Sequence, residues 1–240
     1  MEEGIDLIKV LIEKGSILDV GAESILYKVK FLGFDAVLKY RVKKKYRIND
    51  IDLKIRRFRT YREASSLYEA YISNIPVPKL LYVNLSESVI IMEYISGLRL
   101  REWMLDKSGR DEELISKIAS RLGYLIAKMH NINIVHGDLT TANIILIGLE
   151  SNTPETYILD FGLSDKTESL EAKAVDIELF YRVLKASHTD VADTFFKSFI
   201  NSYVKYVRGA NEIIRRFNIL RRMGRYVERR IRRRDQNYNK

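Results

Sequence analysis

The chain of 240 residues contains no cysteine and only three histidines. The absence of cysteine excludes disulfide bonds and metal sites built from thiolates. Three histidines are too few to favour a zinc site, which usually takes several imidazole or thiolate ligands. Any metal that this protein binds is therefore expected to have oxygen ligands, as Mg²⁺ does.

Long hydrophobic segments are also lacking. No uninterrupted apolar run approaches the ~18 residues that a membrane-spanning helix needs. The start of the chain, MEEGIDLIKV, is acidic and has no apolar core of a signal peptide. With 46% hydrophobic and 30% charged residues, the composition is that of a globular protein of one large or two small domains. We expect a soluble, cytoplasmic protein without a membrane partner.

Basic residues are in excess, and one segment carries the whole net charge of +9. Residues 208–240 contain 12 Lys+Arg against 3 Asp+Glu, whereas residues 1–207 balance at 29 against 29. Apolar side chains at helical spacing predict that this tail docks as an amphipathic helix with its arginines outward. They are Ile213, Phe217, Leu220, Val227 and Ile231. The tail is either solvated or bound to a phosphate-rich partner such as tRNA, and we favour the second.

A second basic cluster, Lys39–Arg62, holds 11 Lys+Arg and 2 Asp. Within it, the stretch 43–62 (KKKYRINDIDLKIRRFRTYR) resembles a basic insert. A solvated loop with a helix face and a nucleic-acid contact are equally good interpretations of this charge pattern.

The candidate chemistry lies in residues 135–162, VHGDLTTANIILIGLESNTPETYILDFG. Asp138 and Asn143 are five residues apart on a loop before a predicted strand, and Asp160 follows a second short strand. Mg²⁺ prefers carboxylate and amide oxygens, so Asn143 and Asp160 are expected to hold it while Asp138 faces the nucleophile. Each piece alone is more often an ordinary turn, but their order matches the protein-kinase signature and favours phosphoryl transfer.

The N-terminal part has the pattern of three short antiparallel strands around Gly21 and Gly33. The turn of Gly21, Ala22 and Glu23 stands where a kinase places its glycine-rich loop over the phosphates. It has one glycine rather than GxGxxG, and Glu23 adds negative charge, so few backbone amides can approach phosphate. On these residues alone a plain hairpin is favoured over a nucleotide contact.

Lys39 ends the fragment Ala36-Val-Leu-Lys39, which is close to the V-A-I-K strand whose lysine pairs with nucleotide phosphates. A lone lysine on a strand is usually a solvated residue. A buried lysine needs a carboxylate partner, and Glu63 lies at the head of a helix pattern that can supply one. We therefore expect a Lys39–Glu63 ion pair.

The apolar run from Val89 to Met92 predicts a buried strand, and the pattern breaks at Glu93. In a bilobal kinase this segment would be the last strand of the small lobe and the hinge. Backbone groups of Glu93 and Ile95 would then hydrogen-bond adenine, with Met92 behind it.

Beyond the hinge the chain is predicted to be helical. We interpret His130 as a structural side chain and expect His136 to brace the catalytic loop. Asp176 is expected to cap backbone amides of that loop from a neighbouring helix, with a plain surface aspartate nearly as good an interpretation.

Taken together, HGDLTTANI, ILDFGLSD, GAES and KAVD resemble the PRPK (Bud-type) family of small atypical serine/threonine kinases/ATPases, the kinase subunit of the KEOPS complex. RIO-type kinases and aminoglycoside phosphotransferases share parts of this pattern. The resemblance implies an α+β, minimal bilobal protein-kinase-like fold, with a small antiparallel-sheet N-lobe, one main N-lobe helix and a reduced helical C-lobe. The expected parts are the N-lobe at 1–95, the C-lobe at 96–207 and a basic helix or tail at 208–240.

The resemblance also implies ATP and Mg²⁺ as cofactors and serine/threonine phosphorylation as the activity. Its implied partners are the tRNA-modifying ATPase subunit and the other KEOPS subunits, which make threonylcarbamoyladenosine at adenosine 37 of certain tRNAs. By position, Lys39 corresponds to the phosphate-binding lysine, Glu63 to its partner, Asp138 to the catalytic base, and Asn143 and Asp160 to the metal ligands. The expected nucleotide contacts also include Gly21, Ala22, Glu23, Ala36, Met92, Glu93, Ile95 and Ile145.

Three functional hypotheses remain at this point. Thr140 replaces the phosphate-neutralising lysine of many protein kinases, and a short segment without Ala-Pro-Glu separates Asp160 from a helix pattern at Leu170. We therefore favour partner-gated ATP turnover with weak protein kinase or autokinase activity. The alternatives are a tRNA-binding scaffold with a vestigial kinase site, and a small-molecule phosphotransferase, which the basic composition disfavours for cationic substrates.

Overall fold

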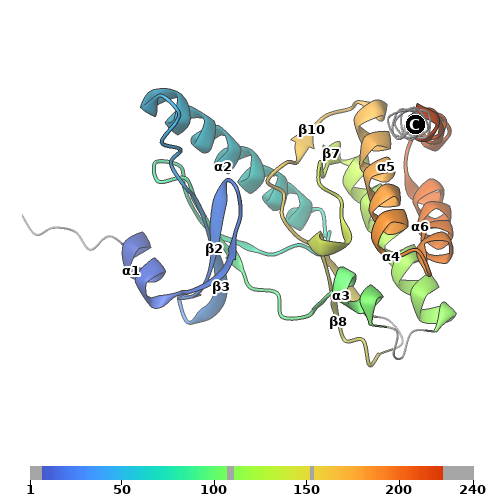
Figure 1. The fold of residues 1–240 in the computed structure, drawn as a ribbon, viewed down its shortest axis with the longest axis horizontal. Coiled ribbons are helices and arrows are strands. Elements are labelled where there is room, and N and C mark those ends of the chain that lie inside the picture. The colour runs from blue at the N-terminus through green and yellow to red at the C-terminus, as the bar shows by residue number, and fades with distance from the viewer. Residues whose placement is uncertain (1–6, 107–110, 152–153, 224–240) are drawn as a thin grey trace, which may run out of the picture. The chain divides into compact units, whose positions relative to one another are not determined.

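The computed structural model describes residues 7–106, 111–151 and 154–223. The chain forms two compact units, which we call the sheet unit (residues 1–97 and 157–164) and the helical unit (residues 98–156 and 165–240). Figure 1 shows the elements of both. The segment 157–164, which carries Asp160, belongs to the sheet unit although it follows the first part of the helical unit in sequence.

The sheet unit is built on five antiparallel strands in the order β1-β2-β3-β5-β4. Their bounds are β1 Ser16–Val20, β2 Ser24–Phe31, β3 Phe34–Arg41, β4 Leu80–Asn84 and β5 Val89–Glu93. Leu32 and Gly33 join β2 to β3 and both have positive φ, 50° and 85°. Two central residues with positive φ are what a tight two-residue hairpin requires, which explains the glycine. The three antiparallel strands expected here are confirmed.

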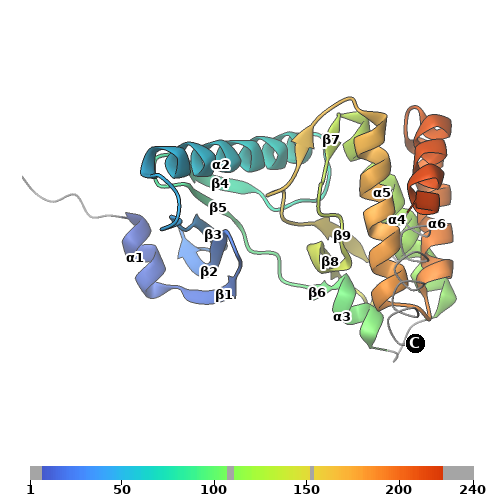
Figure 2. The ribbon, with the colours of Figure 1, turned by 45° about the horizontal axis from the view of Figure 1, so that its top comes forward.

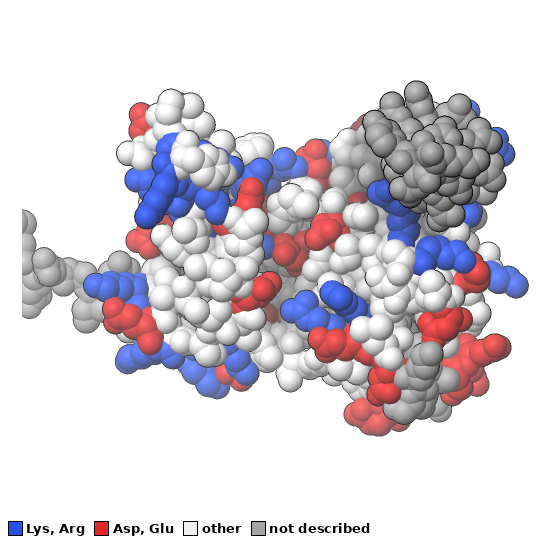
Figure 3. Space-filling view, viewed as in Figure 1, with Lys and Arg blue, Asp and Glu red and all other residues white. Residues whose placement is uncertain are grey.

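One long helix, α2 (Asn49–Ile72), contacts β4 and β5 of the sheet (Figures 1 and 2). Its buried side chains include Glu63, Leu67 and Ala70. The helix begins 14 residues before Glu63, so most of the stretch interpreted as an insert is helical and Glu63 lies well inside the helix. The arginine, lysine and leucine residues of this stretch are good helix formers, which explains why it is helical. Figure 3 shows basic side chains gathered over the start of α2.

A small helix, α1 (Leu7–Lys14), contacts β2 and packs through Ile8 on one face of this sheet. Ile8 belongs to an apolar cluster that also contains Val29, Phe31, Ala36, Leu38, Val89 and Ile91. These residues come from β2, β3 and β5, so the cluster holds the middle strands together. It thereby fixes the direction of β3, which carries Lys39 close to its end.

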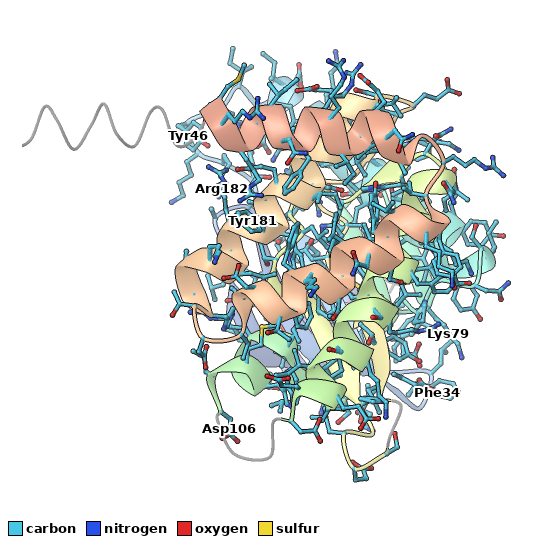
Figure 4. The ribbon with its side chains drawn as sticks, turned by 90° about the vertical axis from the view of Figure 1, so that its right-hand side faces the viewer. Phe34, Tyr46, Lys79, Asp106, Tyr181 and Arg182 are labelled. Carbon is cyan, nitrogen blue, oxygen red and sulfur yellow. The ribbon has the colours of Figure 1, made fainter. Side chains whose placement is uncertain are left out.

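The helical unit is built mainly on helices, whose bounds are α3 Leu100–Leu105, α4 Glu112–Asn131, α5 Leu170–Ser187 and α6 Ala192–Tyr206. Figure 4 shows the helices of this unit from one side. The backbones of α4 and α6 approach closely at Gly123, where an added Cβ would collide with the backbone of Phe199. None of the helices in the described ranges combines the length and apolar character needed to cross a bilayer.

Short strands form two further small sheets. β7 (Ile134–Val135) pairs with β10 (Asp165–Lys166). A second sheet has the order β6-β8-β9, with bounds β6 Leu98–Arg99, β8 Ile144–Ile147 and β9 Glu155–Ile158. The loop between β7 and β8, which includes the 3-10 turn η1 (Thr141–Asn143), carries Asp138 and Asn143.

Residues 210–223 are also helical. Phe217 is buried there, with ring centroids 6.0 Å from Tyr181 and 5.6 Å from Phe196. Arg221 covers Tyr181, which is labelled in Figure 4, with its guanidinium 4.2 Å from the ring centroid. The expected amphipathic docking is confirmed for this part of the tail, whereas its continuation through Val227 and Ile231 falls outside the described residues.

Candidate active site

Lys39 and Glu63 form a buried ion pair in the sheet unit. Lys39 lies on β3 and Glu63 on α2, 24 residues apart, and Lys39 Nζ is 2.7 Å from Glu63 Oε1. The two residues are 5% and 1% exposed. Separating the two residues would leave two uncompensated buried charges, which is strongly unfavourable. The pair therefore holds α2 against β3. The predicted ion pair is confirmed.

Asp160 meets the same lysine from a distant part of the chain. Lys39 Nζ lies 2.6 Å from Asp160 Oδ1, across 121 residues of sequence. Burial lowers the pKa of Lys39, but the neighbouring Glu63 and Asp160 carboxylates outweigh that effect and raise it above its ordinary value. Lys39 is therefore an ammonium ion held between two carboxylates.

The backbone around Asp160 is strained and crowded. Asp160 has φ of +57°, a left-handed conformation that non-glycine residues seldom adopt and that often marks functional sites. The N–H of Gly162 donates to Asp160 Oδ1 at 3.0 Å, and a Cβ added at Gly162 would lie only 2.9 Å from that oxygen. A side chain at position 162 would therefore displace the Asp160 carboxylate from this hydrogen bond.

Arg41 was not among the predicted site residues, yet it is part of this cluster. Its Nη2 lies 2.6 Å from Glu63 Oε2, and the residue is 4% exposed. Side chains two apart on a strand share a face, so the spacing of Lys39 and Arg41 was a usable signal. Whether that face was buried, however, depended on where α2 packs.

Asp138 and Asn143 meet in the helical unit. The amide nitrogen of Asn143 donates to the backbone oxygen of Asp138 at 2.9 Å and to its Oδ2 at 3.0 Å. Both bonds use the Nδ2 group, so the side-chain oxygen of Asn143 is left to act as a ligand. The carboxylate of Asp138 is held in one orientation by the same contact, as a catalytic base requires.

Asp176 of α5 anchors this loop through its backbone. It accepts hydrogen bonds from the N–H groups of His136 at 2.5 Å and Gly137 at 2.8 Å. Burial raises the pKa of Asp176, but His130 and the His136 N–H outweigh that effect, so that the pKa falls below its ordinary value. The predicted capping of the catalytic loop by Asp176 is confirmed.

The two histidines near the loop have structural contacts. His130 Nε2 lies 3.2 Å from Asp176 Oδ2, and its Nδ1 lies 2.7 Å from the hydroxyl of Tyr203 on α6. His136 Nδ1 accepts the N–H of Asp138 at 3.3 Å. These contacts agree with a structural His130 and a bracing His136, as predicted. Tyr203 was not predicted, because its contact depends on the packing of α6 against α4.

The turn proposed to cover phosphates is tied to the basic segment that follows β3. The N–H of Gly21 donates to the backbone oxygen of Ser24 at 2.9 Å, which closes an ordinary hairpin. Glu23 forms an ion pair with Arg59 of α2, and Lys44 Nζ donates to the backbone oxygen of Ala22. The negative charge of Glu23 is therefore paired by α2.

Of the predicted hinge residues, Met92 and Glu93 end β5, whereas Ile95 lies two residues beyond the strand and is buried. Met92 is buried, and the N–H of Glu93 donates to the backbone oxygen of Lys79 at 2.9 Å. Adenine recognition at Glu93 would therefore have to use its carbonyl group. Ala36 pairs with Glu93 across the sheet and is fully buried, while Ile145 lies buried on β8 in the helical unit.

Each unit offers an oxygen donor of the kind that Mg²⁺ binds. In the sheet unit Asp160 offers a carboxylate on a side chain that is 45% exposed, and in the helical unit Asn143 offers an amide oxygen, because its Nδ2 group is the one bound to Asp138. No group of three or more His, Asp or Glu side chains in the described ranges is arranged as a metal cage. Mg²⁺ is usually held by one or two carboxylates together with phosphate oxygens and waters, so a small donor set is what such a site needs.

Two solved structures share the fold of this chain. WaaP in complex with acyl carrier protein aligns with a TM-score of 0.65 at 13% identity, over 95% of this chain and 93% of that one. The Rio2 kinase-ADP/Mg²⁺-phosphoaspartate complex from Chaetomium thermophilum aligns with a TM-score of 0.53 at 16% identity, over 88% of this chain and 70% of that one. The fold, an antiparallel sheet unit followed by a helical unit, is thus protein-kinase-like, as predicted.

Comparisons of sequence are more specific. A family model described as RIO domain matches residues 24–194. KEOPS complex subunit Bud32 of Pyrococcus abyssi is 38% identical over 218 residues, which cover 87% of this chain and 95% of that protein. EKC/KEOPS complex subunit SPAP27G11.07c of Schizosaccharomyces pombe is 34% identical over 89% of each chain.

A third relative is a larger protein. The probable bifunctional tRNA threonylcarbamoyladenosine biosynthesis protein of Methanobrevibacter smithii is 36% identical over 86% of this chain, which matches 36% of that protein. The RIO-domain match and the relatives aligned over nearly their whole length agree with the resemblance drawn from HGDLTTAN and ILDFG. The chain belongs to the RIO-domain family and, within it, to the family of KEOPS complex subunit Bud32.

Proposed function

We propose that this protein is an ATP- and Mg²⁺-dependent atypical serine/threonine kinase and ATPase that acts as a KEOPS subunit in forming threonylcarbamoyladenosine on tRNA. One observation carries the catalytic part of the proposal: Lys39 is bound at once by Glu63 and by Asp160. A lysine between the helix glutamate and the Asp-Phe-Gly aspartate is the arrangement that nucleotide phosphates and their metal need. The relatives' names support the KEOPS part.

Each side chain has a defined task in this proposal. Lys39 binds nucleotide phosphate, and Glu63 keeps its ammonium in place. Asp160 and Asn143 hold Mg²⁺, which when bound neutralises charge on the phosphates. Asp138 orients the attacking hydroxyl or water and accepts its proton, with its own orientation set by Asn143.

ATP hydrolysis is proposed as the main reaction, with transfer to serine or threonine as a weaker one. Helix α5 begins at Leu170, so only residues 161–169 separate Asp160 from it, as the sequence predicted. A segment this short leaves little platform for a protein substrate. Water or the chain's own hydroxyl groups are therefore the favoured acceptors, and a partner subunit is the proposed regulator.

The proposal is tested by replacing Asp160. Asp160→Asn should reduce ATP hydrolysis about a hundredfold or more, because it removes the carboxylate that meets the metal and leaves a neutral amide. The fold should survive, since Lys39 keeps Glu63 as a partner. Phosphate release with Mg²⁺ and with a chelator measures the effect, and circular dichroism checks the fold.

The matched control is Asp19→Asn on β1, whose side chain accepts the N–H of its neighbour Val20 in an exposed position. This control should hydrolyse ATP as the unchanged protein does. Full activity in folded Asp160→Asn would remove Asp160 from the mechanism and the proposed metal site with it.

A tRNA-binding role is the second candidate, and the basic tail favours it. The described helix at 210–223 keeps arginines at its surface while Ile213 and Phe217 are buried. The apolar side of this helix can therefore stay packed while the arginines on its opposite side contact phosphate. We propose that this tail, including residues beyond 223, contacts tRNA bound to the KEOPS partner subunits. The intact Lys39, Glu63 and Asp160 cluster argues against a purely scaffolding role.

A further inference from the structure

A second buried cation lies beside Lys39. Arg41 follows Lys39 by two residues on β3, so both side chains leave the strand on the same face. Each carboxylate oxygen of Glu63 accepts a hydrogen bond from one of these two cations: Lys39 Nζ lies 2.7 Å from Oε1, and Arg41 Nη2 lies 2.6 Å from Oε2. A Cβ built on Gly162 would lie 3.3 Å from Lys39 Nζ and 3.7 Å from Arg41 Nη2. Both cations therefore face the turn that follows Asp160.

The guanidinium of Arg41 is committed to Glu63. Its Nε and Nη1 atoms are buried and have no hydrogen-bond partner in the described part of the chain. Unsatisfied buried donors are costly, so the position would favour an apolar side chain if only packing mattered. The charge of Arg41 is retained at this cost, which points to a role for the charge itself.

That role follows from the charges in the cluster. Lys39 and Arg41 supply two positive charges, and Glu63 and Asp160 supply two negative charges. Without Arg41 the cluster would carry an excess negative charge where the proposed function places triphosphate. Lys39 would also have to neutralise Glu63 as well as Asp160, and its ammonium would be less available to an incoming anion.

We propose that Arg41 is a positioning residue for nucleotide phosphates: it neutralises and holds Glu63, and so leaves Lys39 free to bind phosphate. The inference rests on the proposed ATP site. This charge role of Arg41 differs in one respect from a purely structural role, in which Arg41 would only hold β3 against α2. A clamp affects every ligand of the sheet unit alike, whereas a charge effect grows with the number of phosphates on the ligand.

Calorimetric titration of adenosine, ADP and ATP with Mg²⁺ separates the two roles. In Arg41→Met, which keeps the length of the side chain without its charge, ATP should bind about tenfold more weakly and ADP less so. Adenosine affinity should change less than about threefold, because adenosine carries no charge. Arg41→Lys keeps the charge and should retain most of the ATP affinity.

The matched control is Lys30→Met, which removes one positive charge from β2 at a side chain that is 71% exposed. Solvent and salt screen such a charge, so ATP affinity should stay at the unchanged level. An equal loss for adenosine and ATP in Arg41→Met, or no loss at all, would overturn the proposal. A failure of the unchanged protein to bind ATP would instead refute the proposed function itself.

A double variant tests whether Arg41 acts through Glu63. The reference for this test is Glu63→Gln, because Glu63 itself holds Lys39. Adding Arg41→Met to Glu63→Gln should change the ratio of ATP to adenosine affinity by less than about threefold, since no carboxylate is left for Arg41 to neutralise. The same comparison decides the question if Arg41→Met alone does not fold, because in the double variant neither partner is left as an unpaired buried charge. A further fall of about tenfold in that ratio when Arg41→Met is added to Glu63→Gln would contradict the proposal.

Discussion

Lys39 illustrates which residue-level features can be predicted from a sequence. Its contacts with Glu63 and Asp160 span 24 and 121 residues, and each partner stands in a motif with its own local pattern. Motif order therefore predicted all three. Arg41 contacts the same glutamate but belongs to no motif, and a basic residue at the end of a strand is usually solvated. Its burial depends on the path of α2, which local patterns do not specify.

The burial of Asp176 could not be predicted from the local sequence either. A helix-borne aspartate was nearly as easily interpreted as a surface residue, because nothing in the sequence around it indicates burial. In the structure it is 1% exposed and accepts two backbone N–H groups of the loop before Asp138. Its partners His136 and Gly137 lie 40 and 39 residues earlier in the chain.

Replacing this carboxylate should destabilise the protein in a pH-dependent way. Asp176→Asn turns one acceptor into a donor that faces an N–H group, and we expect a loss of about 2–4 kcal/mol in the free energy of unfolding at pH 7. The folded-state pKa of Asp176 is lowered, so its stabilising effect is present above about pH 4 and is lost as the pH falls through the folded value.

Urea unfolding measured from pH 7 to pH 3 checks this expectation. The gap between the original protein and Asp176→Asn should narrow as the pH falls. Glu113→Gln, which breaks an exposed pair with Lys117 on α4, should change stability by less than about 1 kcal/mol throughout. A gap of constant width would show that the carboxylate charge is not what anchors the loop.

At the scale of elements, strands and their turns were the easiest to predict. β2 and β3 alternate apolar and polar residues around Gly33, and their register follows from a two-residue turn. The start of α2 was harder. Its first residues are charged and mixed, and the residue before it, Ile48, makes no side-chain cap. No capping residue or apolar stripe therefore marked the helix before its buried half near Glu63.

The helix at 210–223 has a packing role that is separate from the tRNA contact proposed for the tail. Residues 210–223 pack on α5 and α6 through Phe217, so a deletion that includes them would expose apolar core. A functional truncation must therefore end at Met223 rather than before this helix. It removes 7 Lys+Arg and 2 Asp+Glu, a change of five positive charges.

A chain ending at Met223 should fold normally and bind tRNA more weakly. Removing arginines that bind phosphate lowers both the affinity and the steepness with which the affinity depends on salt, so the two should fall together. Filter binding of tRNA across a salt series, with the partner subunits present, measures both. A full-length chain in which the arginines beyond 223 are replaced by glutamine is the matched control for length. Unchanged affinity in the shortened chain would exclude the tail from tRNA binding.

At the scale of the whole molecule, each unit holds one half of the proposed chemistry. The sheet unit brings Lys39, Glu63 and Asp160 together, and the helical unit brings Asp138 to Asn143. The segment 157–164 returns to the sheet unit, where the N–H of Ile158 donates to the backbone oxygen of Pro76 at 2.9 Å. This backbone hydrogen bond helps to hold segment 157–164 in the sheet unit, where Asp160 contacts Lys39.

The fold class and the family were both predictable, because kinase-like motifs occur in a fixed order along the chain. Whether the proposed activity is mainly hydrolysis or mainly phosphorylation was not predictable, since both reactions would use the same nucleotide site. In the proposed mechanism the choice depends on which acceptor, water or a protein hydroxyl, reaches Asp138, and that is a property of partners and substrates rather than of this sequence alone.

The central claim is that Lys39 meets nucleotide phosphate, and an acyl-phosphate derivative of ATP tests it most directly. Such a reagent transfers its acyl group to a lysine amine beside the terminal phosphate, and mass spectrometry of the digested protein identifies the modified residue. We predict acylation at Lys39, and protection of Lys39 when excess ATP and Mg²⁺ are added. Acylation confined to exposed lysines such as Lys30, or labelling of Lys39 that ATP does not reduce, would contradict the account.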